Sequence, residues 1–201
     1  AIAISPGKIF KDSERSLTYS QISDLKIFKY PKISYVEDPK DSTGTHLIAT
    51  VLLTSRKKYS LGLDFDAFTS TIQQFGIGFK ASFSIRNVFK RAEIFEISAK
   101  GRVGSSKDAG DNESRFFNNS DIGADMKLIF PRIIFPVKTE KLIPKSMSPS
   151  TSATIGFTNQ NNIGLDRQNI NLIYNYRWKP KVKITNHLDL FNIQFVRNLN
   201  P

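Results

Sequence analysis

The sequence predicts a mainly β fold, an antiparallel transmembrane β-barrel that follows a short mixed α and β segment. The first observation is a strict alternation of apolar and polar residues over residues 59–68, which residues 75–86 repeat. Successive side chains of a strand point to opposite faces, so each run has one apolar face and one polar face. The second observation is length, because about ten residues let a tilted strand cross a bilayer. Similar runs recur down the chain, which is typical of strands between lipid and a wet lumen.

The composition is compatible with this fold. The chain has 201 residues, of which 39% are hydrophobic and 23% charged, so it is not of the disordered class. It has no apolar run of about 18 residues, which excludes a transmembrane helix. It has no cysteine, which excludes disulfides and thiolate metal sites. Because it opens with neither methionine nor a signal peptide, we interpret it as a mature or excised piece of a larger protein.

The net charge of +11 has two interpretations, a nucleic-acid surface or basic residues spread through loops and a lumen. The basic residues are scattered, and the aromatic residues fall on the opposite faces of the strands rather than between them. Stacking platforms for bases are therefore missing from the pattern. We expect no nucleic-acid partner.

Residues 1–58 form a first region that reads as mixed α and β. Thr18 and Gln21 have the spacing of a capping box, which predicts a helix start with Ile22, Leu25 and Phe28 on one face. Strands are predicted at 31–37 and 46–54, joined by a polar turn over 38–44. The segment is short for an independent domain.

Residues 59–201 form a second region that reads as all β. We predict seven strands, at 59–68, 75–86, 92–104, 121–131, 151–159, 167–178 and 183–197. Leu190 and Val196 leave the register of the last strand open, because they alternate out of phase with Phe191, Ile193 and Phe195. Tyr174, Tyr176 and Trp178 gather near one strand end, as an interfacial aromatic girdle does.

The connections between these strands predict an orientation. Residues 87–91 and 179–182 form short turns, whereas residues 104–120 form a long charged loop. Outer-membrane barrels keep short turns on the periplasmic side, so residues 1–58 are expected in the periplasm. Residues 132–150 break this scheme, because they are long, fall on the periplasmic side and carry prolines that argue against a continuous strand.

The sequence shows no catalytic constellation. His46 and His187 are far apart, each inside a predicted strand, and are expected to be ordinary strand positions. Gly76 and Gly78 lie within a strand and open no helix, so they form no dinucleotide fingerprint. We expect no enzymatic activity, no cofactor and no metal site.

Three segments carry a resemblance to a known family. Residues 7–58 look like the latter part of a POTRA domain. Residues 86–93, with Arg86, Asn87, Phe89 and Glu93, resemble a periplasmic turn of the form RN-(L/V)-F-x-(G/R)-(A/G)-E. Residues 129–136, with Phe130, Pro131, Arg132 and Pro136, resemble an FPR-x-x-x-P segment. Their order resembles the BamA/TamA superfamily of outer-membrane assembly proteins, most closely the TamA-like members of Bacteroidetes type.

The resemblance implies that residues 1–58 are the C-terminal part of a periplasmic POTRA-like domain and that residues 59–201 are the first strands of a larger outer-membrane barrel. It implies a non-enzymatic factor that inserts or exports client proteins through a barrel seam. The partners implied are unfolded outer-membrane or secreted clients, outer-membrane lipids, and periplasmic or inner-membrane assembly proteins. The first barrel strand, with Tyr59, Leu61, Gly62, Leu63 and Phe65, would pair with clients by β-augmentation.

Two other interpretations stay open. One is a porin-like or surface-antigen barrel without assembly activity. The other is a soluble β-sandwich that binds a partner, whose apolar faces would meet in a core.

Overall fold

The computed structural model describes residues 2–69, 73–106, 118–137, 139–162, 165–181 and 183–199. It contains one α-helix, one short 3-10 helix and nine strands in the described part of the chain. In order, these are α1 (Asp12–Asp24), β1 (Phe28–Glu37), β2 (Leu47–Ser55), β3 (Tyr59–Phe68), β4 (Gln73–Arg86), β5 (Ile94–Ser106), β6 (Asn119–Phe130), η1 (Lys145–Met147), β7 (Ser150–Asn162), β8 (Leu165–Lys181) and β9 (Ile184–Asn198). Antiparallel strands dominate, which confirms the mainly β class. None of the described helices has the length and hydropathy of a membrane span.

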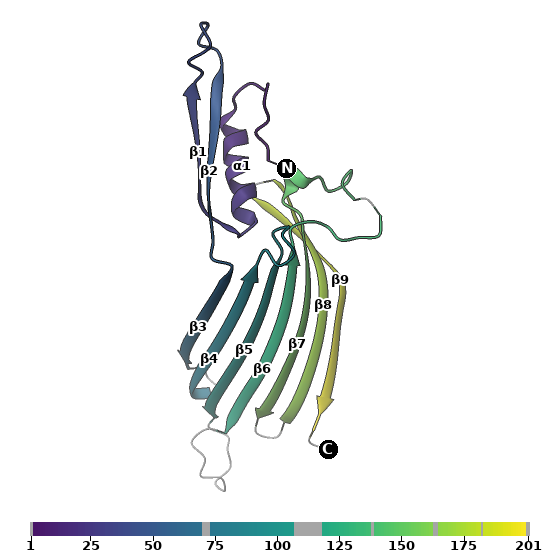
Figure 1. Ribbon diagram of the computed structural model, residues 1–201. Helices are drawn as coiled ribbons and strands as arrows, with labels where there is room; N and C mark the ends of the chain where they lie inside the picture. The colour runs from purple at the N-terminus through teal and green to yellow at the C-terminus, as the bar shows by residue number, and fades with distance from the viewer. Residues whose placement is uncertain are drawn as a thin grey trace.

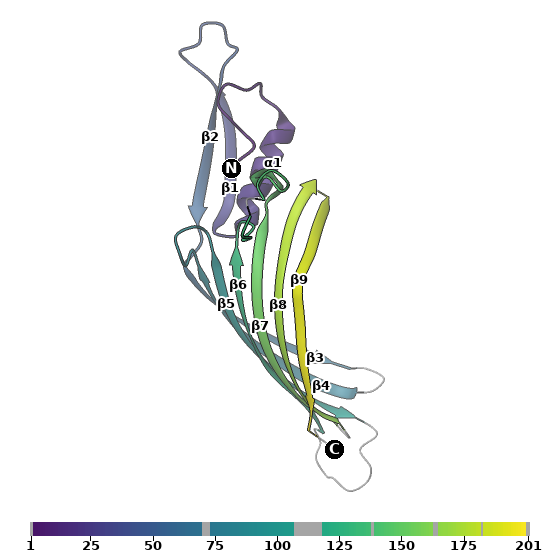
Figure 2. The ribbon, with the colours of Figure 1, turned by 90° about the vertical axis from the view of Figure 1, so that its right-hand side faces the viewer.

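Strands β3 to β9 form one seven-stranded sheet in which every strand pairs with its neighbours in sequence (Figure 1). All pairings are antiparallel. The sheet is curved along its length (Figure 2), and β3 and β9 are its two edges. All seven predicted strands are present, and the sheet is open rather than closed on itself within the described residues.

Two predicted boundaries are wrong. Of the predicted turn at 179–182, residues 179–181 belong to β8, in which Lys181 pairs with Ile184 after an irregularity around Pro180, and residue 182 lies outside the described residues. Residues 92 and 93 precede β5 rather than opening it, because the Glu93 carbonyl accepts the amides of Asn87 and Val88 and closes the preceding turn. Most of the predicted long loop at 104–120 lies outside the described residues.

A β-bulge resolves the register of β9. Tyr174 pairs with Phe191 and Asn175 pairs with Asp189, so Leu190 is an extra residue without a partner on β8. A bulge shifts the alternation of a strand by one residue. Phe191, Ile193 and Phe195 therefore share a face with Leu188, and Val196 points to the other side.

The pairing register sorts the side chains of the sheet into two chemically different faces. One row on the apolar face takes a residue from each strand, namely Leu61, Phe83, Ile97, Met126, Ile155, Leu172 and Ile193. These residues are 38% to 69% exposed. The adjacent row on the polar face is Gly62, Ser82, Ser98, Asp125, Gly156, Asn171 and Gln194.

The hydrophobic core is correspondingly small. Among the described residues only Ile22, Ile94 and Tyr176 are buried hydrophobic side chains. Burying a Leu, Ile or Phe side chain contributes about 1.5–3 kcal/mol relative to leaving it in water. Covering the exposed apolar row with another apolar phase would therefore stabilise the protein by several such contributions.

The glycines indicate which face is concave. A Cβ at Gly62 would lie 2.7 Å from Ser82 Oγ, and one at Gly123 would lie 2.8 Å from Lys100 Cε, both on the polar face. Gly101 lies on the apolar face between Phe79 and Ile122, yet a Cβ there would meet nothing within 4 Å. Side chains converge on a concave surface and diverge on a convex one, so the polar face is the concave side.

Helix α1 begins earlier than the capping-box spacing predicted. It starts at Asp12, with Asp12 and Glu14 in the first turn, where carboxylates favour the helix dipole. Thr18 is a fully buried mid-helix residue whose Oγ1 accepts the Ile4 amide at 3.1 Å, so it caps no helix. Of the predicted face, Ile22 is in the helix, Leu25 is its C-terminal cap, and Phe28 begins β1.

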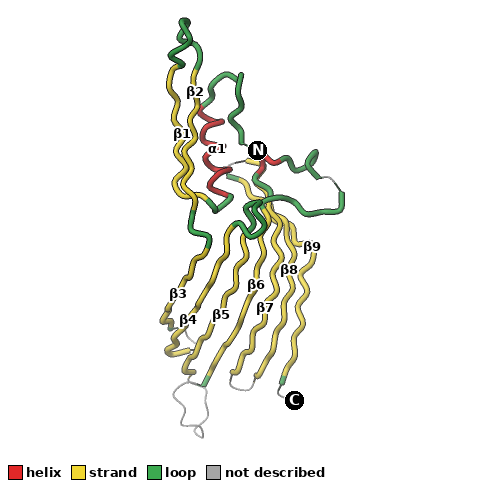
Figure 3. The backbone as a smooth tube through the Cα atoms, in the orientation of Figure 1, coloured by secondary structure: helices red, strands yellow, loops and turns green. Residues whose placement is uncertain are grey.

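Strands β1 and β2 form a separate hairpin, which carries α1 against it at one end of the large sheet (Figure 3). The strand predicted from residue 31 begins at Phe28, because the chain bulges between Lys29 and Lys32, around Pro31, which has no N–H to donate. His46 precedes β2 and belongs to the hairpin tip, so its predicted strand position is wrong. His187 lies in β9 as predicted and pairs with Arg177.

Candidate functional site

The free edge of β3 presents a defined set of backbone groups. The Arg86 amide donates to the Lys58 carbonyl at 2.8 Å. Inter-strand bonds of an antiparallel pair involve every second residue, so the even-numbered residues of β3 bond to β4. The N–H and C=O groups of the odd-numbered residues, including Leu61, Leu63 and Phe65, therefore point away from the sheet.

The predicted residues of this edge divide between the two faces. Tyr59, Leu61, Leu63 and Phe65 lie on the apolar face, and each is more than half exposed. Gly62 lies on the polar face, where Ser82 Oγ occupies the space that a Cβ would need. The edge therefore couples outward-pointing backbone groups to apolar side chains, and Gly62 allows close packing across to β4.

The opposite edge has the reverse arrangement. The Leu199 amide donates to the Asp166 carbonyl at 2.8 Å, so the odd-numbered residues of β9 beyond the bulge bond to β8. The outward backbone groups of β9 belong to Asn192, Gln194, Val196 and Asn198. These lie on the polar face, so the two edges present different surfaces to an added strand.

The predicted turn between β4 and β5 is closed by its own residues. The Asn87 amide donates to the Glu93 carbonyl at 2.6 Å, and Asn87 Oδ1 accepts the Ala92 amide at 3.0 Å. Asn87 has a φ of +58°, which asparagine tolerates better than most residues. Arg86 Nη1 donates to the Lys57 carbonyl at 3.2 Å, which ties the turn to the connection before β3. Phe89 is exposed at its tip.

An ion pair joins this turn to the predicted proline segment. Glu93 has a side chain that is 1% exposed, and its Oε2 accepts the Arg91 amide at 3.0 Å. Arg132 Nη2 lies 3.8 Å from Glu93 Oε1. The two motifs are far apart in the sequence, and the sheet brings them together because β5 and β6 are neighbours.

The proline segment itself is held against β7 and β8. Thr151 is fully buried, its hydroxyl donates to the Arg132 carbonyl at 2.7 Å, and it accepts the Ile134 amide at 2.9 Å. Tyr174 and Tyr176 both donate to the Ile134 carbonyl, at 3.0 and 2.7 Å. Phe130 ends β6, and Pro131 and Pro136 lie before and after the bonded residues. The two tyrosines, expected as girdle residues, therefore anchor this segment.

A cleft of about 550 Å³ lies at the same end of the sheet. Its walls come from α1, the turn before β5, the segment leading to β7, and polar-face positions of β5 to β9, including His187. Lys179 Nζ donates to Asp24 Oδ1 at 2.6 Å, and Gln21 Nε2 donates to the Ser146 carbonyl at 2.9 Å. These contacts fasten α1 across the concave end of the sheet.

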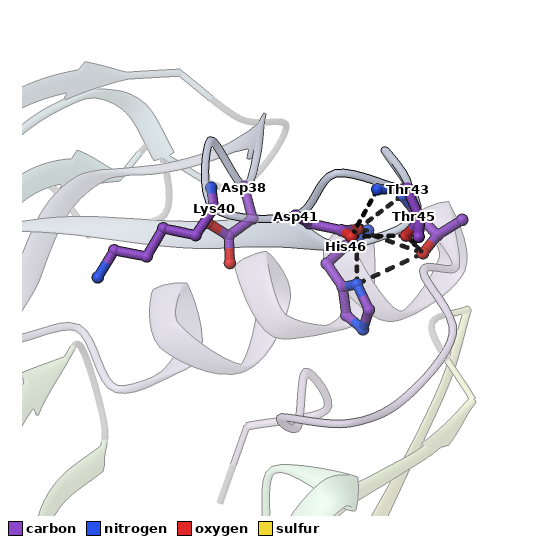
Figure 4. Close-up of polar contacts among 6 residues, drawn as sticks. All are labelled: Asp38, Lys40, Asp41, Thr43, Thr45 and His46. Atoms are coloured by element: carbon purple, nitrogen blue, oxygen red, sulfur yellow. Dashed lines mark hydrogen bonds and ion pairs between the residues drawn. The ribbon is translucent and has the colours of Figure 1, made fainter.

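The tip of the β1–β2 hairpin is organised by one carboxylate (Figure 4). Asp41 Oδ1 accepts the amide and hydroxyl of Thr43, at 2.9 and 2.5 Å. Its Oδ2 accepts the amides of Thr45 and His46 and lies 2.6 Å from His46 Nδ1. The Thr43 hydroxyl, with the Thr43 amide and His46, holds the pKa of Asp41 far below its usual range. Gly44, with a φ of +64°, lets the chain reverse here.

Sequence reasoning missed several of these contacts. Residues 38–44 were predicted as a turn, and Asp followed by Thr and Gly is a usable signal for its geometry. The Lys179–Asp24 pair joins residues 155 positions apart, and no local pattern indicates it. Over the described residues, no group of three His, Cys, Asp or Glu side chains is placed to hold a metal ion.

Comparison with protein-family models found no match, and no curated protein and no solved structure is similar to the chain. Membership of the family that the motifs resemble therefore remains a prediction. The geometry of the sheet, its edges and its concave end is what supports a function.

Proposed function

We propose that this chain belongs to an outer-membrane assembly or translocation factor, in which β3 to β9 are strands of a transmembrane barrel and residues 1–58 are part of a periplasmic POTRA-like domain. The factor inserts or exports unfolded client proteins by letting a client strand pair with the free edge of β3. It works without catalytic residues or a cofactor.

The observation that carries this proposal is the pair of opposite faces on the seven-stranded sheet. Apolar side chains on the convex face are exposed across all seven strands, and no second sheet covers them in the described part of the chain. Of the described residues, only the proline segment packs on this face, at one end of β7 and β8, where Thr151 and Tyr176 are buried. An exposed apolar surface of this extent marks an interaction with lipid or protein. The polar concave face suits a wet lumen. The missing second layer disfavours the soluble sandwich.

The free edge of β3 supports a pairing site. β3 is one of the two edges of the sheet, and its odd-numbered residues direct their N–H and C=O groups away from β4. In lipid these backbone groups must be satisfied. A client strand would satisfy them transiently by β-augmentation.

Proline at Leu63 tests the edge with little disturbance of the fold. The Leu63 N–H points outward, so Leu63→Pro removes a donor from the free edge and leaves the β3–β4 bonds in place. We expect the variant to lose client insertion in proteoliposomes, measured as protease-resistant folded client. Leu63→Ala, which keeps the N–H, is the matched control and should retain most of the activity.

Photolabelling in the same vesicles reports whether the variant still lies in the bilayer. A lipid-phase probe should label Phe79 and Ala81 and leave Lys80 and Ser82 unlabelled, because these residues alternate between the two faces. Normal client insertion by a correctly labelled Leu63→Pro protein would refute the edge mechanism. It would leave a passive porin-like or surface-antigen barrel as the better interpretation.

A further inference from the structure

The cleft beside α1 has an apolar floor. Ile22 and Ile94 are buried there, and Ile129 lies beside Ile94 on the polar-face side of the neighbouring strand. At about 550 Å³ the cleft has the size of a ligand-binding site. It opens toward the concave face, so its occupant comes from the lumen or the periplasmic end rather than from lipid.

The rim of the cleft is basic. Lys26, Arg91, Lys127 and Arg177 line it, and none of them forms an ion pair with a described residue. The two carboxylates of the lining are already engaged, Asp24 with Lys179 at 2.6 Å and Glu140 with Lys145 at 3.2 Å. Charges of one sign around a concave wall focus the field, so the cleft attracts anions.

The cleft also holds acceptors that need donors. Gln21 Oε1 and Asp24 Oδ2 are buried and have no hydrogen-bond partner among the described residues. A buried acceptor without a partner costs free energy, so a bound group that supplies N–H donors is favoured there. The ionised phosphodiester of a lipid headgroup brings acceptors for the basic rim but no hydrogen-bond donor for these two atoms.

We propose that this cleft binds an extended acidic peptide segment of a client, whose carboxylates face the basic rim, whose apolar side chains reach the isoleucine floor and whose backbone N–H groups meet Gln21 and Asp24. The inference rests on the proposed function and adds a recognition site upstream of the β3 edge. The peptide docks at the concave end, beside α1, before its strand pairs with β3.

Fluorescence anisotropy tests this in phosphatidylcholine nanodiscs. The probe is a rhodamine-labelled peptide of alternating glutamate and leucine, and its counterpart with lysine for glutamate is the peptide control. We expect binding of the acidic peptide only. A double variant, Lys127→Gln with Arg177→Gln, should bind about tenfold more weakly, which corresponds to about 1.4 kcal/mol. The loss is modest because both cations are at least partly exposed to solvent, which screens their ion pairs.

A matched variant separates the cleft from general charge. Lys80→Gln with Arg102→Gln removes the same charge from the polar face outside the cleft, and should leave binding unchanged. Equal loss in both double variants would overturn the proposal, as would displacement of the peptide by inorganic pyrophosphate at equal potency. Photolabelling at Phe79 reports the barrel independently. Absent binding by a labelled protein therefore overturns the cleft and leaves the barrel standing.

Discussion

The seven-stranded sheet and the segment before it are stabilised in different ways. In the sheet, every strand follows a two-residue alternation, and the pairing register extends it into one apolar and one polar face. Residues 2–58 lack such a period, and single contacts fix them, such as Thr18 with Ile4 and Asp41 with its turn. The position of a side chain in the sheet is set by whether its face is apolar or polar. In the N-terminal segment, specific hydrogen bonds fix the positions of key residues.

The largest expected effect tests the two faces of the sheet. Ala99 and Ser98 are neighbours on β5 that point to the apolar and polar faces. Ala99→Lys should destabilise the protein in vesicles by about 2–4 kcal/mol, because it places an ammonium group in lipid near the middle of the strand. Ser98→Lys adds the same side chain beside Asp125 on the polar face and should cost less than about 1 kcal/mol. Denaturant unfolding in vesicles measures both.

An equal loss of unfolding free energy in the two lysine variants would contradict the difference between the two faces, on which the contrast between the sheet and residues 2–58 rests. It would mean that the faces meet the same solvent, and that the alternation does not report lipid. A cost confined to Ser98→Lys would reverse the assignment of the faces.

These strands are also where prediction from sequence succeeds and where it fails. The alternation predicted all seven strands, because each residue of a sheet with one apolar and one polar face is constrained by the face on which it lies. It left β9 unresolved, because the bulge at Leu190 inverts the phase within one strand. In the N-terminal segment the capping-box spacing misplaced the start of α1, because Thr18 bonds to Ile4 rather than to its own helix.

The residues of the candidate site were likewise predictable from the sequence, whereas the contacts between them were not. The edge residues of β3 followed from strand order, and the motif residues Glu93 and Arg132 were found separately. Their ion pair, and the tyrosine bonds to Ile134, depend on which strands lie side by side, and only the three-dimensional arrangement supplies that.

An intermediate effect is expected at the ion pair between the β4–β5 turn and the proline segment. Glu93→Ala leaves the partly buried Arg91 amide without its acceptor and the Arg132 guanidinium without its ion-pair partner, and should destabilise the fold by about 1–3 kcal/mol. Glu96→Ala removes a nearby carboxylate, in β5, that forms no ion pair with a described residue, and should change stability by less than about 0.5 kcal/mol. Urea unfolding in vesicles compares the two.

A double-mutant cycle with Arg132→Ala sharpens this result. Arg132 is 43% exposed, so solvent screens the pair, and a coupling free energy of no more than about 1 kcal/mol is expected. Zero coupling would show that Glu93 acts through the Arg91 amide alone, and that the two motifs are adjacent without being linked.

The smallest effect is local and pH-dependent. The Asp41 carboxylate is 12% exposed, and its hydrogen bonds from the Thr43 hydroxyl and amide and from His46 depress its folded pKa below the ordinary value of 3.8. A depressed pKa means that the ionised form favours the folded turn, so its contribution is complete above the ordinary value and is lost as the pH falls through the folded pKa. The Thr45 and His46 amides should therefore stay protected from exchange at mildly acidic pH and lose protection only in strong acid.

Asp41→Ala separates this turn from the rest of the molecule. It removes the acceptor at every pH, so the same amides should exchange rapidly in the range where the parent is protected, measured by hydrogen exchange with mass spectrometry. Exchange in β3 to β9 should not change, because no contact of Asp41 reaches the large sheet. Loss of protection in β3 would mean that the hairpin tip and the β3 edge of the sheet open together, and the two regions would then have to be treated as one cooperative unit.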